Sequence, residues 1–203
     1  MGDNENTSRS RATHLSRLMV LMVFVAACTT GSGNIVTETR ETGAFDRVDV
    51  SSGLAVELSI EAGIPTRVVS VHFDDNLQDK IRTEVVDGTL IVEANGSFTV
   101  TGAGRMVEIA VPSLTALAVS GGASVQGVGA VDQLAVQADG GSRVDLSDLV
   151  VQGMSVVVSG GADLDVTTET SIEGKVSGGA SLTVDGDPVA RDLDVSGGGN
   201  VSG

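Results

Sequence analysis

Few residues of this 203-residue chain have side chains that could carry out catalysis. The chain holds two histidines and one cysteine, whereas a zinc site needs several such ligands, so a zinc site is close to excluded. His72 stands in the apolar sequence Val71-His72-Phe73, where a structural imidazole is far more common than a member of a Ser-His-Asp triad. We therefore predict that the protein is not an enzyme and has no catalytic, cofactor-binding or metal-binding residues.

The carboxylates leave two alternatives open. Asp163 and Asp165 alternate along one predicted strand and would point to the same face roughly 6 to 7 Å apart, a separation found in inverting glycosidases. A polysaccharide lyase or hydrolase of the β-helix type is thus one alternative, although the chain has no Tyr or Trp to stack on a sugar ring. The other is a calcium-dependent binding module with Asp145, Asp148, Asp163 and Asp165 as ligands, although the Gly-Asp nonapeptide repeat of calcium-binding rolls is absent.

A repeat of paired glycines positions these carboxylates. Successive pairs are 19, 20, 18 and 19 residues apart, and a fixed period of this size is typical of a solenoid. Apolar and polar residues alternate on both sides of each pair, which predicts half-buried strands. Glycine adopts the positive φ of a sharp turn without steric cost, so each repeat reads as strand, turn, strand. The pairs are Gly121-Gly122, Gly140-Gly141, Gly160-Gly161, Gly178-Gly179 and Gly197-Gly198.

These observations predict an all-β fold, namely a parallel β-helix-like solenoid with about 19 residues per coil and Gly-Gly turns. This length matches the perimeter of a three-sided coil, with successive coils about 4.8 Å apart. A sandwich of antiparallel hairpins is less favoured, because the turns are identical and evenly spaced.

The first half of the chain is less regular. Ser52-Gly53 aligns with the later glycine pairs, so we predict an earlier coil with Val50 and Val56 in its core. Four further strands are predicted, the last of which ends at Pro112 because proline cannot donate to a β-ladder. A tight turn at Asp87-Gly88 joins two of them. The strands are predicted at 68–71, 81–85, 89–92 and 107–111, with a short helical turn within 74–79.

The amino terminus has the pattern of an export signal. Three arginines precede ten apolar residues at 18–27, which are too few to span a bilayer but suit a secretory signal peptide. The sequence Val25-Ala26-Ala27-Cys28 resembles the lipobox of bacterial lipoproteins, in which the cysteine is lipidated and becomes the mature amino terminus. A conventional signal peptide with a stray thiol is the alternative. We predict a signal peptide at 1–27, lipidation at Cys28, a flexible polar tether at 28–43 and a folded domain at 44–203.

The charge of the exported part restricts its partners. Residues 28–203 contain nine Lys+Arg against 25 Asp+Glu, which disfavours binding to nucleic acid. The lipid on Cys28 would attach the protein to the bacterial membrane or envelope, outside the cytoplasm. The last residues, Val201-Ser202-Gly203, lie inside the fifth repeat without a charged or helical cap, so we also predict self-association through this carboxy-terminal strand edge.

The order of these features resembles the bacterial GIN domain family of auto-transporter adhesin head domains, whose members are often lipoproteins. The resemblance is carried by the lipobox, Phe45 with Val48 and Val50, the Pro112 to Leu117 run and the repeated Val-Ser-Gly-Gly-Ala, and it covers about residues 44–203. It implies a β-helical fold and supplies no catalytic residues. We predict a non-enzymatic envelope lipoprotein that presents an acidic β-solenoid for adhesion, scaffolding or binding of an unknown envelope or surface partner.

Overall fold

The computed structural model describes residues 29–203, so the predicted signal peptide and Cys28 lie outside the described residues. Within this range the fold is all-β, which confirms the predicted class, and the one helical element is a 3₁₀ turn, η1 (Gln78–Lys80). No helix among residues 29–203 is long and apolar enough to cross a membrane. The strands are β1 (Thr29–Thr30), β2 (Ile35–Arg40), β3 (Arg47–Val50), β4 (Ala55–Ile60), β5 (Val68–Asp74), β6 (Ile81–Val86), β7 (Thr89–Ala94), β8 (Phe98–Thr99), β9 (Met106–Val111), β10 (Ala116–Val119), β11 (Ser124–Ala138), β12 (Arg143–Val158), β13 (Asp163–Val176), β14 (Ser181–Asp185), β15 (Ala190–Val195) and β16 (Asn200–Ser202).

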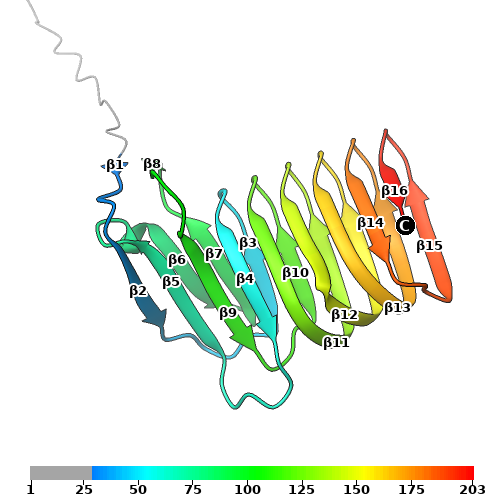
Figure 1. Ribbon diagram of the computed structural model, residues 1–203, viewed down its shortest axis with the longest axis horizontal. Helices are drawn as coiled ribbons and strands as arrows, with labels where there is room; N and C mark the ends of the chain where they lie inside the picture. The colour runs from blue at the N-terminus through cyan, green and yellow to red at the C-terminus, as the bar shows by residue number, and fades with distance from the viewer. Residues whose placement is uncertain (1–28) are drawn as a thin grey trace, which may run out of the picture.

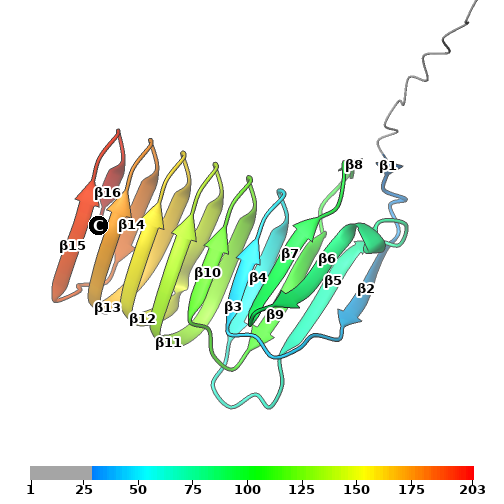
Figure 2. The same ribbon diagram turned by 180° about the vertical axis from the view of Figure 1, so that it is seen from behind.

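Fourteen of the strands form one sheet that folds back on itself (Figures 1 and 2). From β10 onward every pairing is parallel, and paired residues of successive layers lie 17 to 20 positions apart in the sequence. Val125 pairs with Val144, Val144 with Leu164, and Leu164 with Leu182, so the repeat period seen in the sequence is the spacing between neighbouring layers.

Two long arms make up most of each layer (Figure 1). One arm rises to a glycine turn, a second arm descends from it, and the chain then bends into the next layer. β11, β12 and β13 continue through this bend as single strands, and the register of the ladder shifts there, as between Leu146 and Val150. We call the row of glycine turns the turn edge and the opposite row, where the chain passes between layers, the bend edge.

The glycine turns are tight and stacked. In the turn Ser120 to Ala123 the amide of Ala123 donates to the carbonyl of Ser120 at 3.1 Å, and φ is positive at both central residues, Gly121 (61°) and Gly122 (74°). Two successive positive φ values define a type I′ turn. The residue that follows each glycine pair faces the interior. In three of the turns it is a fully buried alanine, namely Ala123, Ala162 and Ala180.

The earlier coil predicted at Ser52-Gly53 fits the observed pairing, because β3 and β4 pair in parallel with β10 and β11. Ser52 has φ of 64° in the place of a first glycine. The four predicted strands are present as β5, β6, β7 and β9, the hairpin between β6 and β7 turns at Asp87-Gly88, and β9 ends before Pro112. The helical turn predicted within 74–79 lies slightly later, at η1.

The spatial order of the layers differs from their order in the sequence. β7 pairs with β3 and β9 pairs with β4, so β7 and β9 make a layer on the far side of the β3–β4 layer. Residues 95–105 therefore occupy the position of a glycine turn in this outermost layer. Antiparallel strands β2, β5 and β6 complete this end of the sheet, and β1 and β8 form a small separate sheet beside it.

One continuous apolar core fills the interior from Phe45 to Val184. It consists mainly of valines and leucines that repeat from layer to layer, such as Val119, Ala138, Val158 and Val176 at the end of the rising arms. Stacking of this kind makes stability the sum of contacts between neighbouring layers.

The predicted flexible tether at 28–43 is wrong for most of its length. Ile35–Arg40 form β2 and pair antiparallel with β5, and Thr29–Thr30 pair with β8. The segment has few apolar residues, but it is held by backbone pairing and by side-chain hydrogen bonds, which polar composition alone does not reveal.

Candidate interaction surface

The descending arms of successive layers form a hollowed outer face. A groove of about 770 Å³ runs over this face from β9 and β4 across to β14. Because side chains alternate along a strand, the polar residues point outward into the groove and the apolar residues point into the core. Its polar lining includes Glu57, Gln126, Asp145, Asp163, Asp165 and Thr183. A second hollow of about 530 Å³ adjoins it and is lined by Glu61, Ser70 and Glu108 among others.

The parallel register brings the groove carboxylates together from separate layers. Asp145 and Asp165 are direct partners on β12 and β13, and Arg143 is the partner of Asp163. The Arg143 guanidinium lies 3.2 Å from the Asp163 carboxylate, while Asp145 accepts hydrogen bonds from the Ser147 hydroxyl at 2.6 Å and amide at 3.2 Å. The groove is acidic overall, with Arg143 as an exposed cation on its rim.

The structure separates the carboxylates that were predicted as calcium ligands. Asp145, Asp163 and Asp165 line the groove, whereas Asp148 is exposed at the bend edge. Within residues 29–203, no three His, Cys, Asp or Glu side chains are placed to hold a metal ion together. Asp163 and Asp165 do share the outer face of β13, but Asp163 is engaged by Arg143.

His72 joins three strands at the end of this face. Its Nδ1 lies 2.8 Å from the Thr37 hydroxyl on β2, and its Nε2 lies 2.9 Å from the Glu108 carboxylate on β9. His72 therefore contacts both neighbouring strands, although its Nε2 does not have the geometry of a hydrogen bond to Glu108.

A buried ion pair fixes the amino-terminal end of the groove. Asp74 is fully buried, and Arg105, whose side chain is 6% exposed, binds it with two nitrogens, one of them at 3.0 Å. The amide of Gly33 also donates to Asp74 at 2.6 Å. The Arg105 hydrogen bonds, aided by the Gly33 amide, lower the pKa of Asp74 to about 2 despite the desolvation that opposes this shift.

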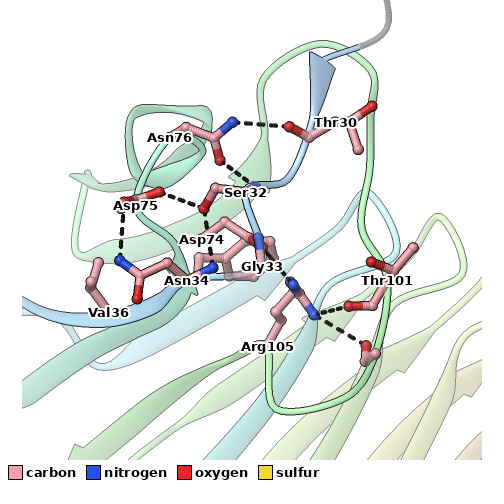
Figure 3. A network of polar contacts seen from close by, with 12 residues as sticks. Thr30, Ser32, Gly33, Asn34, Val36, Asp74, Asp75, Asn76, Thr101 and Arg105 are labelled. Atoms are coloured by element: carbon pink, nitrogen blue, oxygen red, sulfur yellow. Dashed lines mark hydrogen bonds and ion pairs between the residues drawn. The ribbon is translucent and has the colours of Figure 1, made fainter.

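Around this ion pair a polar network holds residues 30–34 against the domain, as Figure 3 shows. Asp75 accepts hydrogen bonds from the Ser32 hydroxyl at 2.6 Å and the Asn34 amide group at 3.1 Å, and these bonds lower its pKa. Asn76 accepts from the Ser32 amide and donates to the Thr30 carbonyl. The segment that follows Cys28 is thereby attached to the turn between β5 and η1.

The rising arms form a second face with smaller side chains. A shallow hollow of about 310 Å³ there is lined by Ala116, Ala118, Ala135, Gln137, Ser155 and Asp49 among others. Partial burial, followed by repulsion from Glu93, raises the pKa of Asp49. The charged residues that line this hollow are Arg47 and Asp49.

Comparison with known proteins agrees with the fold. The family model "Putative auto-transporter adhesin, head GIN domain" matches residues 44–129 and 118–188. The chain belongs to the GIN domain family. This membership confirms the resemblance noted in the sequence, and the family is described as one of auto-transporter adhesin head domains.

A solved structure resembles this GIN domain in fold. A putative adhesin from Bacteroides fragilis shares 19% identity with a TM-score of 0.54, over 85% of this chain and 98% of that one. A putative adhesin from Parabacteroides merdae shares 14% identity with a TM-score of 0.39, over 86% of this chain and 98% of that one. No curated protein matches the chain.

Sequence reasoning found the groove carboxylates but not the ion pair that closes one end of the groove. Asp74 and Arg105 are 31 residues apart, on β5 and just before β9, and nothing in the local pattern joins them. The one usable signal was the placement of Asp74 directly after the apolar residue Phe73 at a strand end, where a charge is buried only with a partner.

Proposed function

We propose that this GIN domain is a non-enzymatic, lipid-anchored protein of the bacterial cell envelope that presents an acidic β-solenoid for adhesion, scaffolding or partner binding. The observation that carries the proposal is the groove, which extends over several layers and is lined by Glu57, Asp145 and Asp165. Charge complementarity favours a partner with a basic surface. The family description supports an adhesive role.

The proposed anchor is a lipid on Cys28. The supporting observations are the lipobox-like sequence before it and the position of Thr29, the next residue, at the start of β1. Such an anchor would keep the domain on the outer side of a membrane, where the groove is open to envelope or surface partners. Lipidation at this residue also accounts for a chain with only one cysteine.

Adhesion can be tested with two matched double variants. Beads coated with the folded chain are applied to purified envelopes, and retention is compared for the parent, Asp145→Asn with Asp165→Asn, and Asp192→Asn with Asp194→Asn. Both variants remove two negative charges, but only the first pair lies in the groove, because Asp192 and Asp194 lie on the face of the rising arms. We expect the groove variant to lose most retention and the control to keep it.

Equal retention by both variants would remove the groove from the proposal. Turnover of an envelope polysaccharide by the parent, abolished by Asp163→Ala, would show that the protein is an enzyme instead. A melting temperature that rises with millimolar Ca²⁺ would favour the calcium-dependent module.

We also propose self-association through the carboxy-terminal strands. Within residues 29–203, β15 pairs only with β13 and β16 only with β14, and Val195 is 45% exposed. An exposed strand edge can add a strand from another chain. Light scattering at increasing concentration should show dimers or larger species, which Leu193→Lys should reduce; a strictly monomeric parent would contradict this.

A further inference from the structure

The two edges of the layered sheet differ strongly in charge. The turn edge consists of the glycine turns and the loop 95–104, and among these residues only Asp139 is charged. The bend edge carries an exposed carboxylate in almost every layer, and the cations beside them are Arg47, Arg67 and Arg191. Its carboxylates are Glu61, Asp132, Asp148, Glu169, Asp185 and Asp187.

The amino-terminal segment joins the domain at the turn edge. β1 pairs with β8, which lies inside the loop 95–104, and the amide of Gly31 donates to the carbonyl of Thr99 at 2.8 Å. Figure 1 shows β1 and β8 beside each other at the edge where the glycine turns lie. Cys28 directly precedes Thr29 in the sequence, so no free linker separates it from β1.

The surface around this junction is largely uncharged. Residues 29–34 and 95–104, which we call the amino-terminal tip, contain no Asp, Glu, Lys or Arg. The nearest acids are Asp74, which is buried against Arg105, Asp75, which is bonded to Ser32 and Asn34, and Asp79, which is followed directly by Lys80. The tip therefore approaches a charged surface with little repulsion.

An anionic membrane surface distinguishes between these edges. Bacterial lipid surfaces that contain anionic headgroups repel carboxylates within a Debye length, about 10 Å at 0.1 M salt. The chain as a whole is acidic, with 25 Asp+Glu against nine Lys+Arg after residue 27. Both the short junction and this repulsion favour one orientation on the membrane.

We propose that the amino-terminal tip and the turn edge face the lipid surface, while the bend edge faces away from it. This inference rests on the proposed lipidation of Cys28. In this orientation the two outer faces of the sheet stand perpendicular to the membrane. The groove therefore opens sideways toward neighbouring molecules rather than toward the lipid. The partner of the turn edge is thus a phospholipid surface.

The test uses the lipidated full-length product in vesicles of phosphatidylcholine and phosphatidylglycerol that contain a lipid with a quencher on its headgroup. Lipidation consumes the Cys28 thiol, so a single introduced cysteine takes a fluorophore at one place only. The variants are Ser97→Cys in the tip, Ser159→Cys in a glycine turn and Thr170→Cys at the bend edge. Gly161 lies in the turn before β13 and Thr170 lies on β13 nine residues later, which places the two edges roughly 25 Å apart.

We expect quenching at Ser97 and Ser159 to be several times stronger than at Thr170, because headgroup quenching falls steeply with distance. Equal quenching at the three sites, or stronger quenching at Thr170, overturns the orientation. The intact mass of the same samples separates the two proposals. An unmodified Cys28 overturns the anchor and the orientation together, whereas a lipidated protein with equal quenching overturns the orientation alone.

Discussion

Gly160 stacks directly on Gly140 of the neighbouring layer. A Cβ atom added to Gly160 would stand 2.8 Å from the backbone nitrogen of Gly140, a distance that real Cβ atoms do not adopt. The same contact recurs between first glycines of successive turns, as at Gly178 above Gly160 (3.0 Å) and Gly121 above Ser52 (3.2 Å). The second glycine of each pair meets nothing within 4 Å and is required only for its positive φ. The two glycines of a turn are thus required for different reasons.

This difference predicts unequal effects of the same substitution. Gly161→Ala should cost about 1 kcal/mol of unfolding free energy, because alanine is disfavoured at positive φ. Gly160→Ala should cost about 2–3 kcal/mol, since the layers must also separate locally to admit the methyl group. Urea unfolding of the two variants measures the difference, and equal losses would show that the turns are not stacked as described.

The ion pair of Asp74 and Arg105 predicts a loss of stability in acid. The pKa of Asp74 is about 2 in the folded protein, below its usual value of about 3.9. The ionised carboxylate therefore stabilises the fold above pH 4, and this contribution is lost as the pH falls toward 2. Arg105→Gln should lower the melting temperature at pH 7. Near pH 2 the difference in melting temperature between this variant and the parent should be smaller. A constant difference across this range would contradict the assignment.

The docked amino-terminal segment predicts a specific effect at Gly31. Its added Cβ would lie 2.8 Å from the Asp74 carboxylate, whereas a Cβ on Gly43 would meet its nearest neighbour only at 4.0 Å; neither glycine has a positive φ. Gly31→Ala should therefore release residues 29–34, and Gly43→Ala should leave them in place. Hydrogen exchange of the amides of Gly31 and Gly33 is the readout, with faster exchange expected in Gly31→Ala only.

Asp49 predicts a stabilising substitution. Burial and the neighbouring Glu93 raise its pKa, so its ionised form is disfavoured in the folded state. A raised pKa means that the fold gains stability from this site as the pH falls toward that value. Asp49→Asn should stabilise the protein at pH 7 by at most about 0.5 kcal/mol, because the site is partly screened by water. A lower melting temperature in this variant at pH 7 would contradict this account.

The repeated half of the fold could be predicted because each layer has the same pattern in the sequence, a glycine pair with alternating apolar and polar residues on both sides. Strand parity places Val125, Val144 and Leu164 inward and Asp145 and Asp165 outward, and the register aligns them once the period is known. The course of the bend could not be predicted, because β11, β12 and β13 continue through it as single strands with shifts in register. Residues such as Ser147 and Asp148, at this position, do not by themselves mark where one arm ends.

The first half could be predicted only strand by strand. β7 pairs with β3 and β9 pairs with β4, so a layer that comes later in the sequence lies outside an earlier one. This arrangement depends on long-range contacts rather than on local sequence pattern. The polar residues Ser32 and Asn34 similarly favour a flexible segment in isolation, but Asp75 and Asn76 supply partners for them from more than 40 positions away. The site thus combines carboxylates visible in the sequence with supports that only the fold reveals.

The central claim is that the domain is displayed from a membrane by a lipid on Cys28. Mass spectrometry of the amino-terminal peptide, taken from protein extracted from the membranes of the producing bacterium, tests it most directly. The account predicts a peptide that begins at Cys28 and carries a lipid on its sulfur, together with loss of membrane association in Cys28→Ser. A mature protein that begins at another residue, or one that retains a free Cys28 thiol, would contradict it.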